Sequence, residues 1–199
     1  MKSLRVEKIE SEWLPLSNIE VSVGECIVIS GPSGVGKSLL LRAIADLDVH
    51  EGNLSIDEVS CNQVPATEWR KQVGLLAAES AWWGDVVSEH MQDVGDEQLE
   101  SLGFDKDALT WLVDRLSTGE KQRLAVLRVL ANSPDFVLLD EPTANLDPKS
   151  VNKVEKLLLD YCHNKPAGLI WVTHDVEQAK RIADKHYCFS ESGLSEVEE

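Results

Sequence analysis

Short apolar runs bounded by glycine, proline or polar residues recur along the chain, and segments of helical periodicity separate them. A strand buried on both faces of a parallel sheet is continuously apolar, whereas a strand with one solvated face alternates. The pattern therefore predicts an α/β fold built on parallel strands. These strands are expected at residues 26–29, 73–76, 135–143, 168–172 and 186–190.

Alternating positions predict two further strands near the start of the chain, at residues 3–10 and 19–23, and residues 51–57 are expected to form a turn and a short edge strand. Apolar residues at helical spacing predict the helices, and capping residues or prolines mark several of their ends. The acidic residues after 190 are expected to be a loose tail. The predicted helices begin after the glycine-rich loop at 31–38 and at residues 67, 116, 148 and 177.

Residues 78–115 differ from the rest of the chain because they are polar and acidic, with short helical pieces at 86–91, 97–102 and 107–113. We interpret the chain as one domain, with a core at 1–77 and 116–199 and a helical insertion between. Trp82, Trp83 and Trp111 are concentrated in the insertion. Either they form its own small core, or Trp82 and Trp83 lie on an exposed apolar groove for a partner.

Composition narrows the possible partners. The chain has 199 residues, 43% of them apolar, and a formal net charge of −16, which argues against sequence-independent binding to nucleic acid or to anionic membranes. No signal peptide is evident, and no apolar run approaches the roughly 20 residues that span a bilayer, so a cytoplasmic chain is expected. The scattered cysteines are expected to be reduced.

The run GPSGVGKS at residues 31–38 fits the phosphate-loop pattern G-x-x-x-x-G-K-[ST] between a predicted strand and a predicted helix. Its glycines allow backbone N–H groups to converge on phosphate oxygens, and the helix start adds positive potential. Lys37 is expected to reach the β- and γ-phosphates, and the Ser38 hydroxyl to ligate Mg²⁺. The predicted nucleotide-binding residues here are Gly31, Pro32, Ser33, Gly34, Val35, Gly36, Lys37, Ser38 and Leu39.

Two acidic residues, Asp140 and Glu141, end the buried strand DFVLLDEPT. Adjacent carboxylates repel each other, so beside a phosphate loop a cation is the better reason for them. Asp140 is expected to hold Mg²⁺ through its water shell, and Glu141 to accept a proton from, or to orient, the attacking water. His174 follows another apolar strand, where α/β sheets bind ligands, and is expected to contact the γ-phosphate. Glu141, His174 and Lys37 are the predicted catalytic residues.

Two more positions could meet a nucleotide. Ser117 and Glu120 have the spacing of a capping box at the start of a helix, which is an anion-binding position. Trp13, the aromatic residue upstream of the phosphate loop, either stacks on adenine or packs on the sheet.

Taken together, GPSGVGKS, LSTGEKQR, FVLLDEPTANLD and WVTHD, in this order, resemble the nucleotide-binding subunit of an ATP-binding cassette (ABC) transporter. The resemblance covers almost the whole chain. It implies a P-loop NTPase (RecA-like) core with an antiparallel β subdomain and a helical insertion. The short length and the GEKQR and WVTHD runs look most like small bacterial subunits paired with a separate membrane protein, including a metal- or iron-exporter type.

In that family two subunits close head to tail around two ATP molecules. The resemblance implies a homodimer in which Ser117, Gly119 and Glu120 contact the γ-phosphate bound by the partner subunit. It also implies that residues 145–147 link the two sites, and that a separate transmembrane permease holds the chain at the inner face of the membrane.

The chain departs from the family pattern at three positions. Ala78 stands where a glutamine normally ligates Mg²⁺ and senses the membrane partner, so altered rather than absent hydrolysis is expected, with water or Glu79 as the substitute ligand. Thr118 replaces a glycine and crowds the partner's phosphate. Leu39 replaces a common threonine, which we expect to be harmless.

The leading hypothesis is therefore ATP hydrolysis coupled to transport through a separate membrane protein. The first alternative is an ATP-switched regulatory or assembly subunit with weak turnover, which Ala78 and Thr118 motivate and which the presence of Glu141 and His174 counts against. A soluble ABC ATPase of the DNA-repair or translation kind is a weaker alternative, because the chain is acidic and carries a single cassette. A nucleotide kinase is excluded by the absence of a predicted substrate lid or second basic phosphate site.

Overall fold

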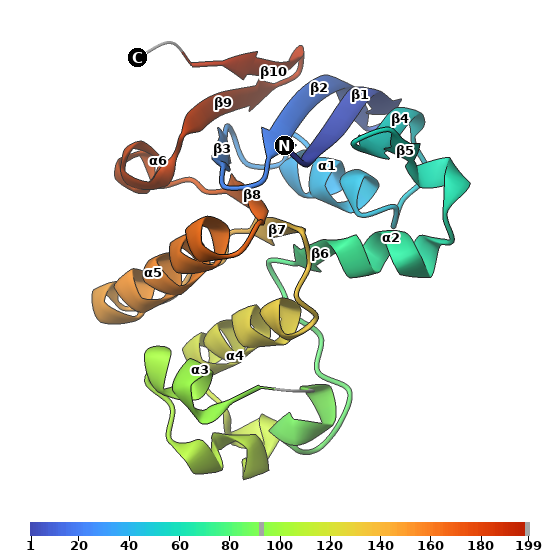
Figure 1. Cartoon of the computed structure of the whole chain (residues 1–199). Helices are drawn as coiled ribbons and strands as arrows, with labels where there is room; N and C mark the ends of the chain where they lie inside the picture. The colour runs from blue at the N-terminus through green and yellow to red at the C-terminus, as the bar shows by residue number, and fades with distance from the viewer. Residues whose placement is uncertain (92–93, 198–199) are drawn as a thin grey trace.

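Two sheets form the framework of the protein, whose computed structural model describes residues 1–91 and 94–197 (Figure 1). The larger sheet has six strands in the order β10-β9-β3-β8-β7-β6. Neighbouring strands are parallel except for β10, which is antiparallel to β9. Its members are β3 (Cys26–Ser30), β6 (Val73–Leu76), β7 (Phe136–Asp140), β8 (Gly168–Val172), β9 (Lys185–Ser190) and β10 (Gly193–Glu196).

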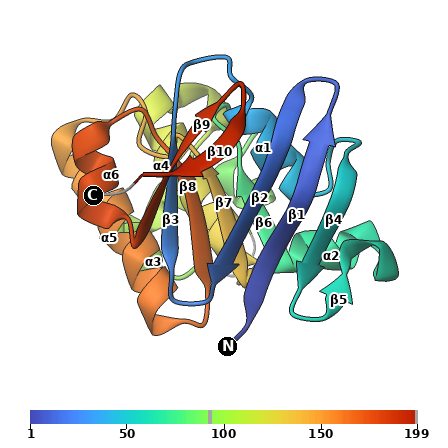
Figure 2. The same ribbon diagram turned by 90° about the horizontal axis from the view of Figure 1, so that it is seen from above.

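The smaller sheet is antiparallel, with four strands in the order β2-β1-β4-β5. Helix α1 (Lys37–Ile44) contacts β1 in this sheet and β6 and β7 in the larger one, so it lies between the two sheets (Figure 2). The strands are β1 (Ser3–Ser11), β2 (Leu14–Ser22), β4 (Glu51–Ile56) and β5 (Val59–Ser60).

Both faces of the central strands are buried, which explains their continuous apolar runs. In β3, Ile27 and Ile29 belong to the apolar cluster shared with the smaller sheet and α1, whereas Cys26 and Val28 belong to the cluster on the opposite face. Successive side chains on a strand point to opposite faces, so each buried run supplies two cores. The expectation of buried parallel strands is confirmed for β3, β7 and β8, although β7 ends at Asp140 rather than at residue 143, where the chain turns at Glu141. Strand β9 is parallel to β3 but mostly only partly buried.

Helices α4, α5 and α6 lie on the second face of the larger sheet (Figure 1). Each starts with a side-chain cap: Ser117, Asp147 and Asp175 accept hydrogen bonds from backbone N–H groups of the first turns. These caps confirm the helix starts predicted near 116 and 148. The other α-helices of the described residues are α2 (Ala66–Gln72), α3 (Asp96–Ser101), α4 (Thr118–Ala131), α5 (Pro148–Asn164) and α6 (Val176–Ile182). A short 3₁₀ helix, η1 (Cys61–Gln63), precedes α2.

In its described residues, the segment between β6 and α4 contains α3 and three 3₁₀ helices, η2 (Val87–His90), η3 (Lys106–Thr110) and η4 (Val113–Arg115). The prediction of a continuous helix at 107–113 is wrong. After η3 the backbone becomes extended and pairs with the start of the segment. Val87 N–H donates to Trp111 C=O at 3.0 Å, and Val113 N–H donates to Asp85 C=O at 2.9 Å. The predicted piece at 86–91 is followed by residues 92–93, which lie outside the described residues.

The tryptophans of this segment differ in their exposure. Trp82 and Trp111 are partly buried against a cluster that also contains residues of α4, α5 and the larger sheet, so the segment shares the core of the domain instead of having a separate one. Trp83 is 74% exposed, with its ring 4.5 Å from that of His90. Its role toward a partner stays a prediction.

Three other sequence predictions are corrected. The second strand starts at Leu14 rather than at residue 19, because the β1–β2 turn is only two residues long. Strand β4 is not an edge strand, since β5 pairs with its outer side. The tail is ordered as β10, where Leu194 pairs with Phe189 and packs against the core. Within the described ranges, no helix combines the length and the apolar character needed to cross a bilayer.

Candidate active site

The carboxyl ends of β3, β8 and β7 are adjacent in the larger sheet, and each leads into one of the motifs found in the sequence. The phosphate loop follows β3, His174 follows β8 by two residues, and Asp140 ends β7. Because parallel strands present the same ends at one edge of a sheet, the three motifs meet there. Strand order, rather than sequence order, therefore assembles the site.

The phosphate loop needs glycine where its backbone passes close to β9. Gly31 has a φ of 146°, and a Cβ atom there would collide with the carbonyl oxygen of Phe189. Gly36, with a φ of 109°, is the N-cap of α1 in a left-handed conformation that favours glycine. The loop therefore enters α1 with its backbone N–H groups unobstructed by side chains at these positions.

Lys37 is drawn back over the loop that precedes it. Its Nζ donates to the carbonyl oxygens of Gly31 at 2.9 Å and Pro32 at 2.7 Å, and only 6% of the residue is exposed. Burial lowers the pKa of Lys37, while the carboxylates of Glu141 and Asp140 act in the opposite direction. The Lys37 side chain is therefore buried and lies near two carboxylates.

The two adjacent carboxylates occupy different environments. Asp140 is the last residue of β7 and is 6% exposed, whereas Glu141 leaves the strand with a φ of 50°. This left-handed conformation is uncommon for a residue with a side chain and marks a sharp turn. The Glu141 N–H donates to the carbonyl of Val172 at 3.1 Å, so the turn is held against the end of β8.

His174 and Glu141 are in contact. The Nε2 atom of His174 lies 2.8 Å from Oε1 of Glu141, and both side chains are partly exposed to the pocket mouth. A pocket of about 210 Å³ contains both of them, together with Lys37 and Asp140. Its lining consists of Ser33, Gly34, Gly36, Lys37, Ser38, Leu39, Asp140, Glu141 and His174.

This pocket can hold a cation next to an anion. The Asp140 carboxylate and the Ser38 hydroxyl both line it, and such oxygen donors suit Mg²⁺. Across residues 1–91 and 94–197, no group of three or more His, Cys, Asp or Glu residues could hold a metal unaided. The donor set therefore fits an ion that shares its coordination with phosphate oxygens and water.

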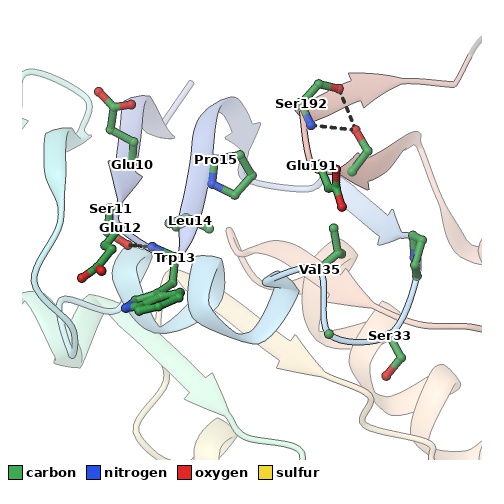
Figure 3. A pocket seen from close by; sticks show the side chains of 13 residues that line it. Glu10, Ser11, Glu12, Trp13, Leu14, Pro15, Ser33, Val35, Glu191 and Ser192 are labelled. Carbon is green, nitrogen blue, oxygen red and sulfur yellow. Dashed lines mark hydrogen bonds between the residues drawn. The ribbon is translucent and has the colours of Figure 1, made fainter.

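Trp13 lies beside the phosphate loop without joining that pocket. It sits in the β1–β2 turn and is 72% exposed, so packing on the sheet is wrong. A wider pocket of about 1050 Å³ runs from Trp13 to the loop residues Ser33 and Val35. In Figure 3, Trp13 lies on one side of this pocket and the two loop residues lie on the other. Glu191, drawn above Val35 in Figure 3, adds a carboxylate on the loop side of this pocket. Stacking on adenine stays a prediction.

The start of α4 forms the predicted capping box. Ser117 Oγ accepts from Glu120 N–H at 3.3 Å, and the Glu120 carboxylate accepts from the Ser117 N–H at 2.8 Å and from its hydroxyl at 2.7 Å. These hydrogen bonds lower the pKa of Glu120. No residue of 117–120 lines the small pocket among the residues that the structure describes. The contact of Ser117, Gly119 and Glu120 with a phosphate remains a prediction.

Two glutamines near the site escaped the sequence analysis. Gln122 is 8% exposed and donates to the Glu141 carbonyl oxygen at 3.4 Å, and Gln178 is 1% exposed. Each stands on a buried helix face among apolar residues, with Ala125 and Val126 near the first and Ala179 near the second. The sequence did contain a signal for them: a glutamine at a position where the helical pattern calls for an apolar residue indicates a buried amide with hydrogen-bond partners.

The family model and the curated relatives that this chain matches indicate the same family. Residues 16–144 match the family described as ABC transporter. The spermidine/putrescine import ATP-binding protein PotA of Bacillus cereus is 28% identical over 98% of this chain, which spans 65% of the PotA length. The aliphatic sulfonates import ATP-binding protein SsuB 2 of Mesorhizobium japonicum is 32% identical over 92% of this chain and 75% of its own length.

Solved structures share the fold. The ATP-binding subunit of an ABC transporter superposes with a TM-score of 0.86 at 19% identity, covering 98% of this chain and 89% of its own. A bacterial Atm1-family ABC exporter with ATP bound gives a TM-score of 0.85 at 22% identity, over 97% of this chain and 38% of that one. These likenesses confirm the predicted P-loop NTPase fold with its antiparallel β part.

Proposed function

The chain belongs to the ABC transporter family, and we propose that it is an ATP-hydrolysing subunit that powers transport through a separate transmembrane protein. The observation that carries the proposal is the 2.8 Å contact between Glu141 and His174 in a pocket that Lys37 and Asp140 also line. The named relatives PotA and SsuB 2 are import ATP-binding proteins, which supports a membrane partner for this chain.

In this proposal the N–H groups of the phosphate loop and the Lys37 ammonium bind the β- and γ-phosphates of ATP. Ser38 and Asp140 would hold Mg²⁺, which supplies charge neutralisation on the phosphate oxygens. Glu141 accepts a proton from the attacking water or orients it, and His174 donates to the γ-phosphate from beside Glu141. Trp13 stacks on the adenine.

A second copy of the chain completes the site. The small pocket holds a single lysine, whereas the transition state of phosphoryl transfer spreads negative charge over three equatorial oxygens. The N-terminus of α4, with Ser117 and Gly119, provides further N–H donors at a helix start of the second copy. We therefore propose a head-to-tail homodimer with one ATP between each phosphate loop and the opposite α4, and with residues 145–147 between the two sites.

The test compares the native chain with Glu141→Gln in ATP hydrolysis and in Mg²⁺-ATP-dependent dimerisation followed by light scattering. Hydrolysis by the native chain, and a stable ATP-bound dimer of a variant that no longer hydrolyses, are expected. Glu68→Gln, which changes an exposed carboxylate paired with Lys71 away from the pocket, is the matched control and should behave as the native chain.

A second candidate function is an ATP-switched regulatory or assembly subunit of a membrane complex. It is favoured by Ala78, exposed beyond the end of β6, and by Thr118 at the first position of α4. If the native chain and Glu141→Gln dimerise equally and neither hydrolyses ATP, the transport function is rejected in favour of this second function.

A further inference from the structure

One buried side-chain amide joins the two loops that carry Glu141 and His174. Gln178, on α6, is 1% exposed. Its Nε2 donates to Oγ1 of Thr143 at 2.9 Å, and its Oε1 accepts from the Thr173 hydroxyl at 2.7 Å. Thr173 is 5% exposed, and Thr143 is partly exposed.

The two threonines flank the proposed catalytic pair. Thr143 comes two residues after Glu141, in the turn that leaves β7, and Thr173 comes directly before His174, in the turn that leaves β8. The Thr173 hydroxyl also accepts from the N–H of Asp175, so His174 lies within a hydrogen-bonded turn. The Gln178 amide therefore links these two turns through their side chains, in addition to the backbone bond from the Glu141 N–H to the Val172 carbonyl.

The second N–H of this amide has a charged partner. Gln178 Nε2 donates to Oε1 of Glu155 at 2.8 Å, and Glu155, on α5, is paired with Arg181 at 2.6 Å. The Glu155 carboxylate raises the pKa of Arg181 by accepting from its guanidinium. The pair fixes Glu155 as an acceptor, so Gln178 must donate to it.

Few side chains could take this place. The position needs donors for Thr143 and Glu155 and an acceptor for Thr173, and the amide is an uncharged group that offers both kinds of atom in one plane. A carboxylate at 178 would face the Glu155 carboxylate without a proton between them, and a leucine would leave buried polar atoms unpaired. The chemistry of the amide, and not only its shape, is therefore used.

We propose that Gln178 is a positioning residue that holds Glu141 and His174 in their mutual contact, an inference that rests on the proposed hydrolytic function. It touches neither reacting group and acts through Thr143 and Thr173. Displacing one turn relative to the other lengthens the 2.8 Å contact, and a misplacement of about 1 Å can cost up to about 10²-fold in rate.

The experiment measures kcat and KM for ATP in Thr143→Val, Gln178→Leu and Thr143→Ser. Valine keeps the branched shape of Thr143 and removes only its hydroxyl, so this variant is informative even where Gln178→Leu does not fold. We expect kcat about tenfold lower in Thr143→Val with KM within about twofold, and near-native kcat in Thr143→Ser. The matched control is Thr110→Val, because the Thr110 hydroxyl is exposed and bonds only to the Asp107 carbonyl.

A double-mutant cycle separates positioning from general loss of structure. Adding Thr143→Val to His174→Ala should lower kcat by less than about twofold, because the contact to be positioned is already gone. An undiminished tenfold loss in the His174→Ala background would overturn the proposal, since Thr143 and Gln178 would then act independently of His174.

A second readout does not depend on turnover. In protein labelled with ¹⁵N-histidine, the His174 imidazole resonance, identified by its loss in His174→Ala, should shift in Thr143→Val and stay in place in Thr143→Ser and Thr110→Val. An unshifted resonance in Thr143→Val would overturn the inference whether or not the chain hydrolyses ATP. A shifted resonance in a chain without hydrolysis supports the positioning role and rejects the proposed function.

Discussion

His174 and Glu141 meet at 2.8 Å although they leave two different strands of the larger sheet. The strands β8 and β7 are neighbours, with Val172 paired to Asp140, so the residues that follow them emerge side by side. The left-handed turn at Glu141 then brings its carboxylate to the imidazole. This contact is the feature on which the proposed chemistry depends.

Removal of the imidazole should disable hydrolysis. We expect His174→Ala to lower kcat by about 10²–10³, because loss of one positioned hydrogen-bond donor to the charge that develops in the transition state costs roughly that factor. ATP binding, measured with a fluorescent analogue, should change little, since Lys37 and the loop N–H groups remain. A kcat within about twofold of the native value would remove His174 from the proposed mechanism.

Glutamine at position 78 should change how the site uses Mg²⁺. Ala78 comes two residues after Leu76, which pairs with Leu139 next to Asp140, so a longer polar side chain there can reach the Asp140 edge. We expect Ala78→Gln to lower the Mg²⁺ concentration that gives half-maximal hydrolysis and to change turnover. Ala77→Gln, at the exposed neighbouring position, is the control. Identical Mg²⁺ titrations for native chain and Ala78→Gln would contradict the prediction.

Thr118→Gly should tighten the ATP-bound dimer. Thr118 is exposed at the first position of α4, where a side chain stands between the helix N–H groups and a phosphate of the partner copy. In the Glu141→Gln background, the ATP concentration for half-maximal dimerisation should fall, as followed by light scattering. Thr118→Ser, which keeps a side chain at the same place, serves as the control. An unchanged or higher concentration means that Thr118 does not crowd the site.

Trp13 can be tested against an equally exposed tryptophan. Stacking of an aromatic ring on a base contributes about 1–3 kcal/mol, so Trp13→Ala should weaken ATP binding by roughly 5- to 150-fold. Trp83, which is 74% exposed against 72% for Trp13, lies outside both pockets that adjoin the phosphate loop. Trp83→Ala should leave the affinity unchanged in equilibrium titration. Equal affinities of the two variants for ATP would show that Trp13 does not stack on the adenine.

The capping box at α4 predicts a pH dependence of stability. Hydrogen bonds from Ser117 lower the pKa of Glu120 from its ordinary value of 4.5. A carboxyl group with a lowered folded-state pKa contributes stability above its unfolded pKa and loses it as the pH falls through the folded value. In urea unfolding, the difference between the native chain and Glu120→Gln should therefore be largest near pH 7 and shrink below pH 4.5.

Ser117→Ala provides the matched comparison, because loss of the capping hydroxyl costs about 1 kcal/mol at neutral pH. If the difference in unfolding free energy between the native chain and Glu120→Gln stays constant down to pH 3, the ionised carboxylate is not part of the cap.

By itself, the sequence determined the features that depend on neighbouring residues. The phosphate loop follows from glycines spaced to bare the backbone N–H groups, and the capping box at Ser117 follows from a side chain that satisfies orphan donors one turn away. The apolar runs of β3, β7 and β8 indicated strands buried on both faces, because no period of two is left when both faces are covered.

The tertiary structure decided what depends on strands that are distant in sequence. The order β3-β8-β7 placed His174 beside Glu141. The pairing of Phe189 with Leu194 made a strand, β10, of the tail that was expected to be loose. The two-residue turn between β1 and β2 left Trp13 exposed to solvent. Gln178 links the two loops only because the tertiary structure places its amide within hydrogen-bond distance of Thr143 and Thr173. Such contacts come from the packing of whole elements, whose hydrogen bonds and buried area leave no local period in the sequence.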